Sequence, residues 1–169
     1  AEADAVRAAV RALVATNVTV IAAAGNGGPA DDACGRLPAA LAGGGPSSGV
    51  LAVAAADLED KFEVDGPPRR RARRRSTPPY AFSSTGRCVS VWAPGVDVLG
   101  ACGAAGRCAD PGSGRAYTFA SGSSMAAPHV AGAAALFLGA NPGATPAEVV
   151  AWVLGRASGG AVEGAGRGR

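Results

Sequence analysis

The sequence predicts an α/β fold with a mainly parallel sheet, because continuous apolar runs alternate with segments of helical periodicity. Val18–Ala24 and Val50–Ala55 are runs of β-branched and small apolar residues next to glycine-containing turns, as expected for strands buried on both faces. Residues 2–16 carry apolar side chains at the spacing of an amphipathic helix. Helices and strands that alternate in this way pack as layers around a parallel sheet.

Further elements continue this alternation toward the C-terminus. We expect a third strand at Cys88–Trp92, stopped by a Pro-Gly pair, and a short strand at Tyr117–Ala120. Ser124–Ala140 is rich in small apolar residues and predicts a buried helix that ends at an Asn-Pro pair. Another helix is expected to begin after Thr145. Thr145 is its N-cap, Pro146 is its first residue, and Glu148 is at the third position, where it can form a capping box with Thr145.

The 169 residues have the size of one domain. We expect residues 1–158 to form it, and the glycine-rich residues 159–169 to form a frayed tail. Residues 61–79 predict an exposed insertion, with six arginines between Arg69 and Arg75. An arginine run of this kind is most often a solvated loop, and the alternatives are a processing site, a localisation signal or a phosphate-binding patch.

Composition and charge exclude several classes of protein. The chain is 48% hydrophobic with a net charge of +3, which argues against disorder, and its 26 glycines lack the three-residue period of collagen. The apolar stretches are short and interrupted by Gly, Pro or charge, so we expect no membrane span. The excess positive charge lies in the arginine run, so the rest of the domain is not expected to bind nucleic acid. The first residues lack the pattern of a signal peptide.

The chain has four cysteines and no Cys-x-x-Cys pair, which argues against a zinc site. The four are Cys34, Cys88, Cys102 and Cys108. An even, small number of cysteines favours two disulfides in a secreted protein, and the alternative is buried free thiols.

The segment Phe119–Gly132 is the most informative, because a glycine-containing turn leads there into a helix at two serines. A serine hydroxyl at a helix N-terminus lies near free backbone N–H groups, which can stabilise a developing oxyanion. Taken alone, such a pair is usually no more than a helix cap. The Gly-x-Ser-x-Gly elbow of α/β-hydrolases does not fit, because its last position is Ala126.

Residues 122–132, GSSMAAPHVAG, resemble the catalytic-serine signature of the subtilisin-like serine proteases (subtilases), with Ser123 in place of the usual threonine. VIAAAGN at 20–26, WAPG at 92–95 and PGATPA at 142–147 resemble other segments of this family, in the expected order. The resemblance covers nearly the whole chain. It implies the subtilisin-like three-layer α/β fold, incomplete at its N-terminal side, because the family's Asp and His motifs precede the segment where this chain begins.

The resemblance implies a serine endopeptidase that acts on proteins or peptides through an acyl-enzyme. Ser124 would be the nucleophile, and the side-chain amide of Asn26 would form the oxyanion hole together with the Ser124 N–H. The backbone of Ala23, Ala24 and Gly25 would line the S1 pocket. Taken alone, Asn26 would be interpreted as a turn residue.

The chain cannot assemble a catalytic triad by itself, so the resemblance implies the missing N-terminal half as a partner. His129 is the only histidine, and on a helix its distance of five residues from Ser124 directs its ring away from the serine. The family pattern makes it structural. Asp31, Asp32 and Asp97 are in predicted loops with no partner base. The fragment alone is expected to be inactive.

Within the family, the chain is most similar to the proteinase K and aqualysin branch. The segments around Cys34 and Cys88 resemble those that form a disulfide in the aqualysin group, which leaves Cys102 to pair with Cys108. Ser90 stands where the proteinase K branch often has a calcium-binding aspartate, so that site is expected to be lost and no metal or other cofactor is expected. A secreted or extracytoplasmic location follows from the family and the disulfides.

Two other functions remain as alternatives. The first is a non-catalytic, subtilase-derived module whose arginine-rich loop binds acidic partners. It is disfavoured because Ser124 and Asn26 are both retained. The second is an esterase with a different triad, which is disfavoured by the absent elbow glycine and by the absence of a usable histidine.

Overall fold

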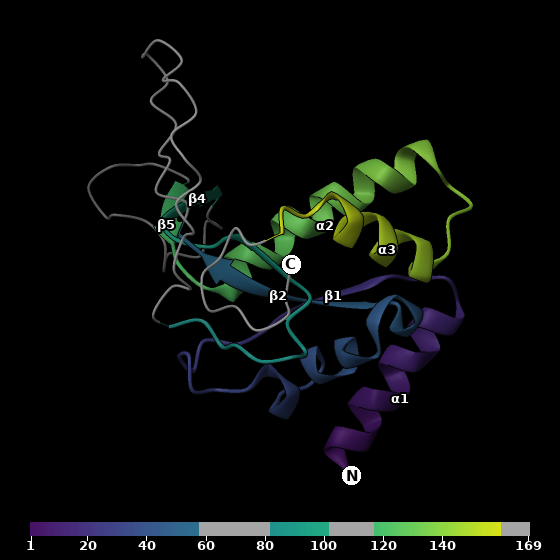
Figure 1. Cartoon of the computed structure of the whole chain (residues 1–169), viewed down its shortest axis with the longest axis horizontal. Helices are drawn as coiled ribbons and strands as arrows, with labels where there is room; N and C mark the ends of the chain where they lie inside the picture. The colour runs from purple at the N-terminus through teal and green to yellow at the C-terminus, as the bar shows by residue number, and fades with distance from the viewer. Residues whose placement is uncertain (58–81, 102–116, 160–169) are drawn as a thin grey trace.

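The computed structural model describes residues 1–57, 82–101 and 117–159, and three strands form the centre of this structure (Figure 1). The strands lie in the order β1, β2, β3, with bounds Val20–Ala23, Val50–Ala56 and Val91–Pro94. Both neighbouring pairs are parallel. The predicted α/β fold with a mainly parallel sheet is therefore confirmed.

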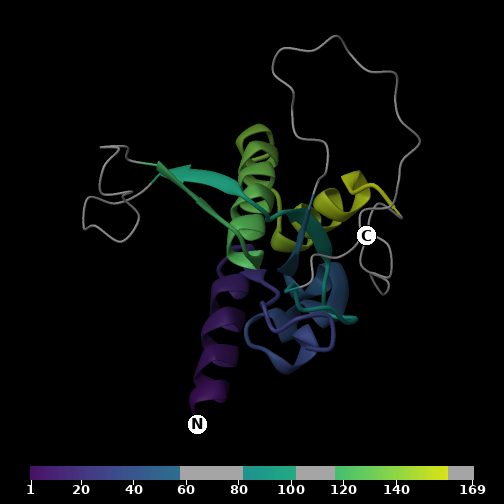
Figure 2. The same cartoon turned by 90° about the vertical axis from the view of Figure 1, so that its left-hand side faces the viewer.

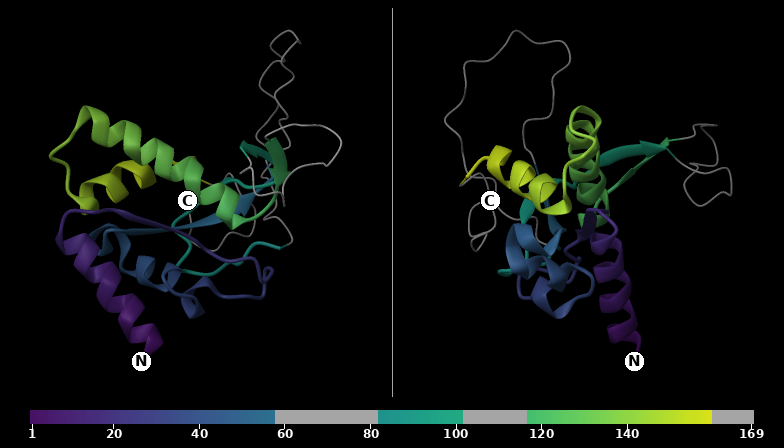
Figure 3. Two further views of the ribbon diagram at one scale, coloured as in Figure 1. Left: turned by 180° about the vertical axis from the view of Figure 1, so that it is seen from behind. Right: turned by 90° about the vertical axis from the view of Figure 1, so that its right-hand side faces the viewer.

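Helices cover both faces of this sheet, so the structure has three layers (Figures 1 and 3). The helices α2 (Ser123–Ala140) and α3 (Pro146–Arg156) pack on one face. The helix α1 (Glu2–Ala15) and the 3-10 segment η2 (Ala39–Ser48) pack on the other, and a second 3-10 segment, η1 (Ala33–Gly35), precedes η2. The layers agree with a subtilisin-like fold.

Strand β2 is buried along its whole length because it carries the packing surface of both layers. Leu51, Val53 and Ala55 face α2 and α3, whereas Val50 and Ala52 face α1 and η2. This alternation follows from the two-residue period of a strand. The continuous apolar run in the sequence is thus explained by two buried faces rather than one.

A two-stranded antiparallel sheet lies apart from the central one and projects from the molecule (Figure 2). It consists of β4 (Val98–Ala101) and β5 (Tyr117–Ala120), with Leu99 opposite Phe119. The short strand at 117–120 was predicted. Its partner β4 was not, because a Val-Leu-Gly-Ala segment has no clear period.

The predicted strand at Cys88–Trp92 begins too early, since β3 starts at Val91. Local bonds explain the difference. The Val89 N–H closes a turn with the carbonyl of Gly86. Ser90 then bonds to Ala52 twice: its N–H donates to the Ala52 carbonyl, and its hydroxyl accepts the Ala52 N–H. The contact with β2 thus begins before β3, and one of its bonds uses the side chain of Ser90.

The expectation that every apolar stretch is too short to span a membrane is wrong for α2. This helix has 18 residues and a mean hydropathy of 1.2, so its length and composition alone would allow a membrane span. Pro128 and Gly132 lie inside the helix without interrupting it. Only 22% of its residues are buried, because one flank of α2 faces no other element in the described part of the chain (Figure 2).

Several predictions from the sequence lie outside the described residues. These are the insertion at 61–79 with its arginine run, the tail from residue 160 onward, and the pairing of Cys102 with Cys108. They stay predictions.

The N-terminus of α3 offers a direct test of the local sequence signals. The Thr145 hydroxyl accepts a hydrogen bond from the Glu148 N–H, and the Glu148 carboxylate accepts one from the Thr145 N–H, which completes the predicted capping box. Replacement Thr145→Ala should lower the free energy of unfolding of the native polypeptide by about 1 kcal/mol. Urea denaturation measures the loss, and Thr145→Ser, which keeps the oxygen, should recover most of it.

Candidate active site

The site predicted from the sequence lies where the carboxyl ends of the parallel strands meet the N-terminus of α2. The Gly122 N–H donates to the carbonyl of Gly95, directly after β3, and the Gly25 N–H, after β1, donates to the Ser123 hydroxyl. A Cβ added to Gly95 would lie 2.5 Å from Ala55 Cβ and 2.9 Å from the Gly122 carbonyl oxygen. The close approach of strand ends and helix therefore requires glycine at 95.

Ser124 is the second residue of α2, and its side chain is exposed. Its hydroxyl has no hydrogen-bond partner among the described residues. Its backbone N–H is also unpaired there, because the first N–H groups of a helix have no acceptor within it, whereas those of Met125 and Ala126 already bond to the Gly122 carbonyl. An exposed hydroxyl thus stands beside a free N–H at the positive end of an 18-residue helix.

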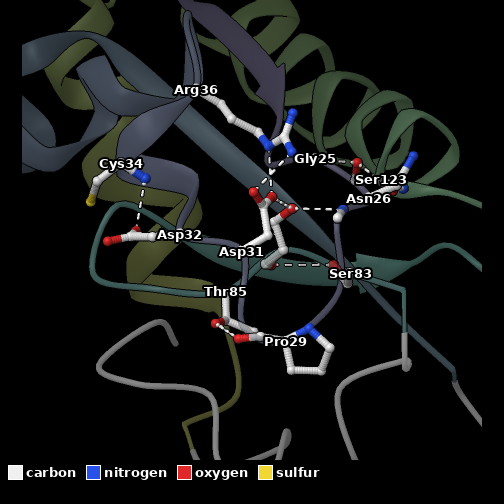
Figure 4. Close-up of polar contacts among 12 residues, drawn as sticks. Gly25, Asn26, Pro29, Asp31, Asp32, Cys34, Arg36, Ser83, Thr85 and Ser123 are labelled. Atoms are coloured by element: carbon white, nitrogen blue, oxygen red, sulfur yellow. Dashed lines mark hydrogen bonds and ion pairs between the residues drawn. The ribbon is translucent and has the colours of Figure 1, made fainter.

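Ser123 has the opposite environment, because its side chain is fully buried. Its N–H and its hydroxyl both donate to Asn26 Oδ1, each over 2.9 Å, and its hydroxyl oxygen accepts the Gly25 N–H over 3.1 Å (Figure 4). Ser123 therefore joins the loop after β1 to the start of α2. A threonine hydroxyl could make the same bonds, which explains why serine can replace the usual threonine.

The carboxamide of Asn26 is oriented by these bonds. Its oxygen is occupied by Ser123, so its Nδ2 is left as a donor, and Nδ2 has no partner in the described part of the chain. A Cβ added to Gly122 would lie 3.2 Å from Asn26 Nδ2 and 3.7 Å from the Ser124 nitrogen. The two free donors therefore border one small space, which glycine at 122 (φ 155°) leaves open.

The residues that the sequence assigned to the S1 pocket continue β1 into this loop. Ala23 ends the strand and Gly25 is partly exposed, whereas the side chain of Ala24 is fully buried and its N–H bonds to the Val53 carbonyl. Ala24 can therefore present only backbone to a ligand, and the assignment of this segment to an S1 pocket stays a prediction.

Among the described residues, His129, Asp97 and Asp32 all bond to groups other than Ser124. His129 Nδ1 lies 2.9 Å from the Met125 carbonyl oxygen, so the ring bonds to its own helix. Asp97 accepts a hydrogen bond from the Ser121 hydroxyl, and Asp32 accepts one from the Cys34 N–H at the start of η1. The expected absence of a triad within this chain stays a prediction.

A polar cluster next to the site was missed by the sequence analysis. The Asp31 carboxylate accepts two hydrogen bonds from the Arg36 guanidinium, over 2.6 and 2.8 Å (Figure 4). It accepts a third from the Ser84 hydroxyl. The hydrogen bonds from Arg36 and then from Ser84 lower the pKa of Asp31, and Asp31 raises the pKa of Arg36. The only signal in the sequence was an Asp and an Arg five positions apart.

The Cys34–Cys88 disulfide that the resemblance implies is present and connects η1 to the segment before β3. No group of three or more His, Cys, Asp or Glu side chains that could hold a metal ion occurs among residues 1–57, 82–101 and 117–159. The expected loss of a calcium site at Ser90 stays a prediction.

An α/β protein with a free serine and two free N–H donors at its strand ends has the framework of a nucleophilic hydrolase. The chain belongs to the subtilase family (peptidase S8), since the family's sequence profile matches residues 2–168. Alkaline serine exoprotease A of Vibrio alginolyticus is 35% identical over 154 residues, which cover 91% of this chain and 22% of that protein.

Two further comparisons agree with this family. The extracellular serine proteinase of Thermus sp. (strain Rt41A) is 41% identical over 87 residues, 52% of this chain and 19% of that protein. The crystal structure of a cold-adapted subtilisin-like serine proteinase is similar with a TM-score of 0.67 and 29% identity, over 95% of this chain and 46% of that one. The chain thus spans about a fifth of the length of these curated relatives.

The lowered pKa of Asp31 makes a prediction about acid stability. A carboxylate whose pKa is lower in the folded state stabilises the fold above its ordinary value of 3.8, and this stabilisation is lost as the pH falls through the folded value. Asp31→Asn should therefore weaken the acid dependence of the unfolding free energy below about pH 4. Urea denaturation of the native polypeptide between about pH 5 and pH 2 measures it.

Glu148 provides the comparison, because hydrogen bonds from the Thr145 N–H and then the Thr145 hydroxyl lower its pKa also. The Glu148 carboxylate therefore also stabilises the fold above its ordinary pKa of 4.5, and this stabilisation is lost as the pH falls through its lower pKa in the folded state. Glu148→Gln should remove the acid dependence of the unfolding free energy that comes from Glu148 and leave the acid dependence that comes from Asp31. An unchanged pH profile for Asp31→Asn would contradict the prediction.

Proposed function

We propose that this chain is the C-terminal portion of the catalytic domain of a subtilisin-like serine endopeptidase. In this proposal the chain supplies the nucleophile Ser124 and the oxyanion-hole residue Asn26, and a longer polypeptide supplies the triad His and Asp. The observation that carries the proposal is the orientation of the Asn26 carboxamide. Ser123 occupies its oxygen, and among the described residues its NH₂ group has no partner and lies beside the Ser124 N–H.

The proposed reaction begins with attack of Ser124 Oγ on a peptide carbonyl carbon. A base takes the hydroxyl proton, and the carbonyl oxygen becomes an oxyanion that accepts hydrogen bonds from Asn26 Nδ2 and the Ser124 N–H. The intermediate then expels the amine, which takes the proton from the base, and leaves an acyl-enzyme on Ser124. Attack by water, deprotonated by the same base, releases the acid and restores the serine.

The partner in this proposal is an N-terminal half of the same domain. Strand β1 is an edge strand in the described sheet, so its outer backbone groups are open to a further strand. Leu13, Val18 and Leu136, in α1, at the entry to β1 and in α2, are exposed large apolar side chains. An apolar helix such as α2 is normally covered on all sides, and the missing half would supply that cover.

Three finer assignments belong to the same proposal. The proteinase K and aqualysin branch is favoured by the disulfide between Cys34 and Cys88. A secreted or extracytoplasmic location is favoured by that disulfide and by relatives named as extracellular. Loss of the calcium site is favoured by Ser90, whose hydroxyl bonds to the Ala52 N–H inside the fold.

The first test is covalent labelling of the native polypeptide with a fluorophosphonate, followed by intact mass and N-terminal sequencing. We expect a chain longer by at least about 100 residues, an addition of the size of a small domain, which reacts with the probe at Ser124. Ser124→Ala should abolish both labelling and peptide hydrolysis, because no other group replaces the nucleophile. A native chain that begins at Ala1 and does not react would favour the non-catalytic module that binds acidic partners.

The second test concerns Asn26. Asn26→Ala should lower kcat by about 10²–10³ with little change in KM, because the lost donor acts on charge that develops only in the transition state. Asn141→Ala, which removes an exposed carboxamide at the far end of α2, is the matched control and should leave kcat within about two-fold. Equal effects of the two substitutions would contradict the assignment.

The third test concerns the proposed partner. The isolated 169 residues should unfold without a sharp transition or should associate, because the β1 edge and one flank of α2 lack their cover. Thermal unfolding followed by circular dichroism, together with sedimentation, measures both properties. A cooperative, monomeric 169-residue chain would contradict the need for a missing half.

A further inference from the structure

The segment that holds Asn26 has few restraints of its own. Asn26 is exposed and stands between Gly25, with φ 117°, and Gly27. Two glycines around one residue give the backbone wide conformational freedom. An oxyanion hole works only when its donors are held in place before the reaction. In this oxyanion loop, residues 25–27, Ser123 holds the Asn26 carboxamide oxygen and the Gly25 N–H, so the rest of the loop backbone must be held by another part of the chain.

Ser84 makes bonds on both sides of Asn26. Its N–H donates to the Gly25 carbonyl over 3.0 Å, and its hydroxyl oxygen accepts the Gly27 N–H over 3.2 Å. Ser84 is completely buried, so water does not compete for these bonds. The residue thus clamps the loop from a different segment of the chain, 57 positions away from Gly27.

Asp31 and Arg36 determine which way the Ser84 hydroxyl points. A serine hydroxyl has one proton to donate, and that of Ser84 goes to the Asp31 carboxylate, so its oxygen faces the Gly27 N–H. Asp31 is held in turn by two hydrogen bonds from the Arg36 guanidinium, a planar two-point contact that fixes the plane of the carboxylate. The order of contacts is Arg36, Asp31, Ser84 and then the loop.

The loop also packs directly against this cluster. A Cβ added to Gly25 would lie 2.7 Å from Ser84 Oγ and 2.8 Å from Arg36 Cδ, and one added to Gly27 would lie 2.6 Å from Asp31 Cγ. The backbone on either side of Asn26 thus touches the cluster. A change in the position of Arg36 or Asp31 would therefore move the backbone of Gly25 and Gly27.

From these contacts we infer that Arg36, Asp31 and Ser84 form a positioning network that holds Asn26 Nδ2 in place for the oxyanion. The inference rests on the proposed function of Asn26. None of the three residues touches the reacting atoms, so each acts through the backbone of residues 25–27. The network adds residues to the site that lie outside all four family-like segments.

The test measures hydrolysis of a peptide substrate by the complete gene product that contains this chain. Arg36→Met keeps the aliphatic stem against Gly25 and removes the hydrogen bonds to Asp31. We expect it to lower kcat by about 10-fold with KM nearly unchanged, because misplacement of a donor affects mainly the transition state. Ser84→Ala should have the same signature, and Arg36→Lys should restore only part of the rate, because lysine lacks the planar two-point contact.

A double-substitution cycle separates positioning from general stability. If Arg36 acts through Asn26, Arg36→Met should cause almost no further loss of kcat in the Asn26→Ala background. Thr85→Val is the matched control, because the Thr85 hydroxyl, next to Ser84 in the chain, bonds to the Pro29 carbonyl, which lies after the oxyanion loop. It should leave kcat within about two-fold.

The outcomes distinguish this inference from the proposed function. A wild-type protein without peptidase activity would overturn both. An active wild-type protein in which Arg36→Met and Ser84→Ala keep full kcat would overturn the network alone. Multiplicative losses for Arg36→Met and Asn26→Ala would also overturn it, because the arginine would then act independently of the amide.

Discussion

The burial of β2 on both faces is the constraint on which the rest of the structure depends. One set of its alternating side chains packs on α2 and α3, and the other packs on α1 and η2. Because its residues are Val, Leu and Ala, both layers approach the sheet closely. The small side chain of Ala55 lets Gly95 and Gly122 meet at the strand ends, where any larger residue at 95 would collide. The packing of an alanine-rich strand thus brings the start of α2 to the sheet.

The two adjacent serines show how this framework separates structure from chemistry. Ser123 is fully buried and uses its N–H and its hydroxyl to bind the Asn26 carboxamide, so it is part of the framework. Ser124 is exposed and keeps both its hydroxyl and its N–H unpaired in the described part of the chain. One step along a helix rotates the side chain by about 100°, which is enough to place neighbours in opposite environments. The separation therefore depends on the position at which the helix begins.

Much of the fold could be predicted, because apolar periodicity and capping residues are local signals. The strand β2, the helix α1 and the capping box at Thr145 follow from such signals. The β4 strand and the start of β3 could not, because they depend on a distant partner strand and on the Ser90 side chain.

The candidate site, too, could be predicted from the sequence only in part. The motif around Ser124 is contiguous and could be identified from the sequence. The cluster of Asp31, Arg36 and Ser84 could not, because Ser84 is 53 residues from Asp31 and meets it only in the folded chain.

The parallel topology also limits where the proposed triad His and Asp of a longer polypeptide can be placed. The open edge of the sheet is β1, and the loop with Asn26 follows directly from the carboxyl end of β1. A further strand that pairs in parallel with β1 would end next to this loop, since the carboxyl ends of parallel strands share one edge of a sheet. A residue that follows such a strand would then face Asn26 and the N-terminus of α2. The open β1 edge beside Ser124 therefore supports the proposal that one segment of a longer polypeptide completes both the sheet and the triad.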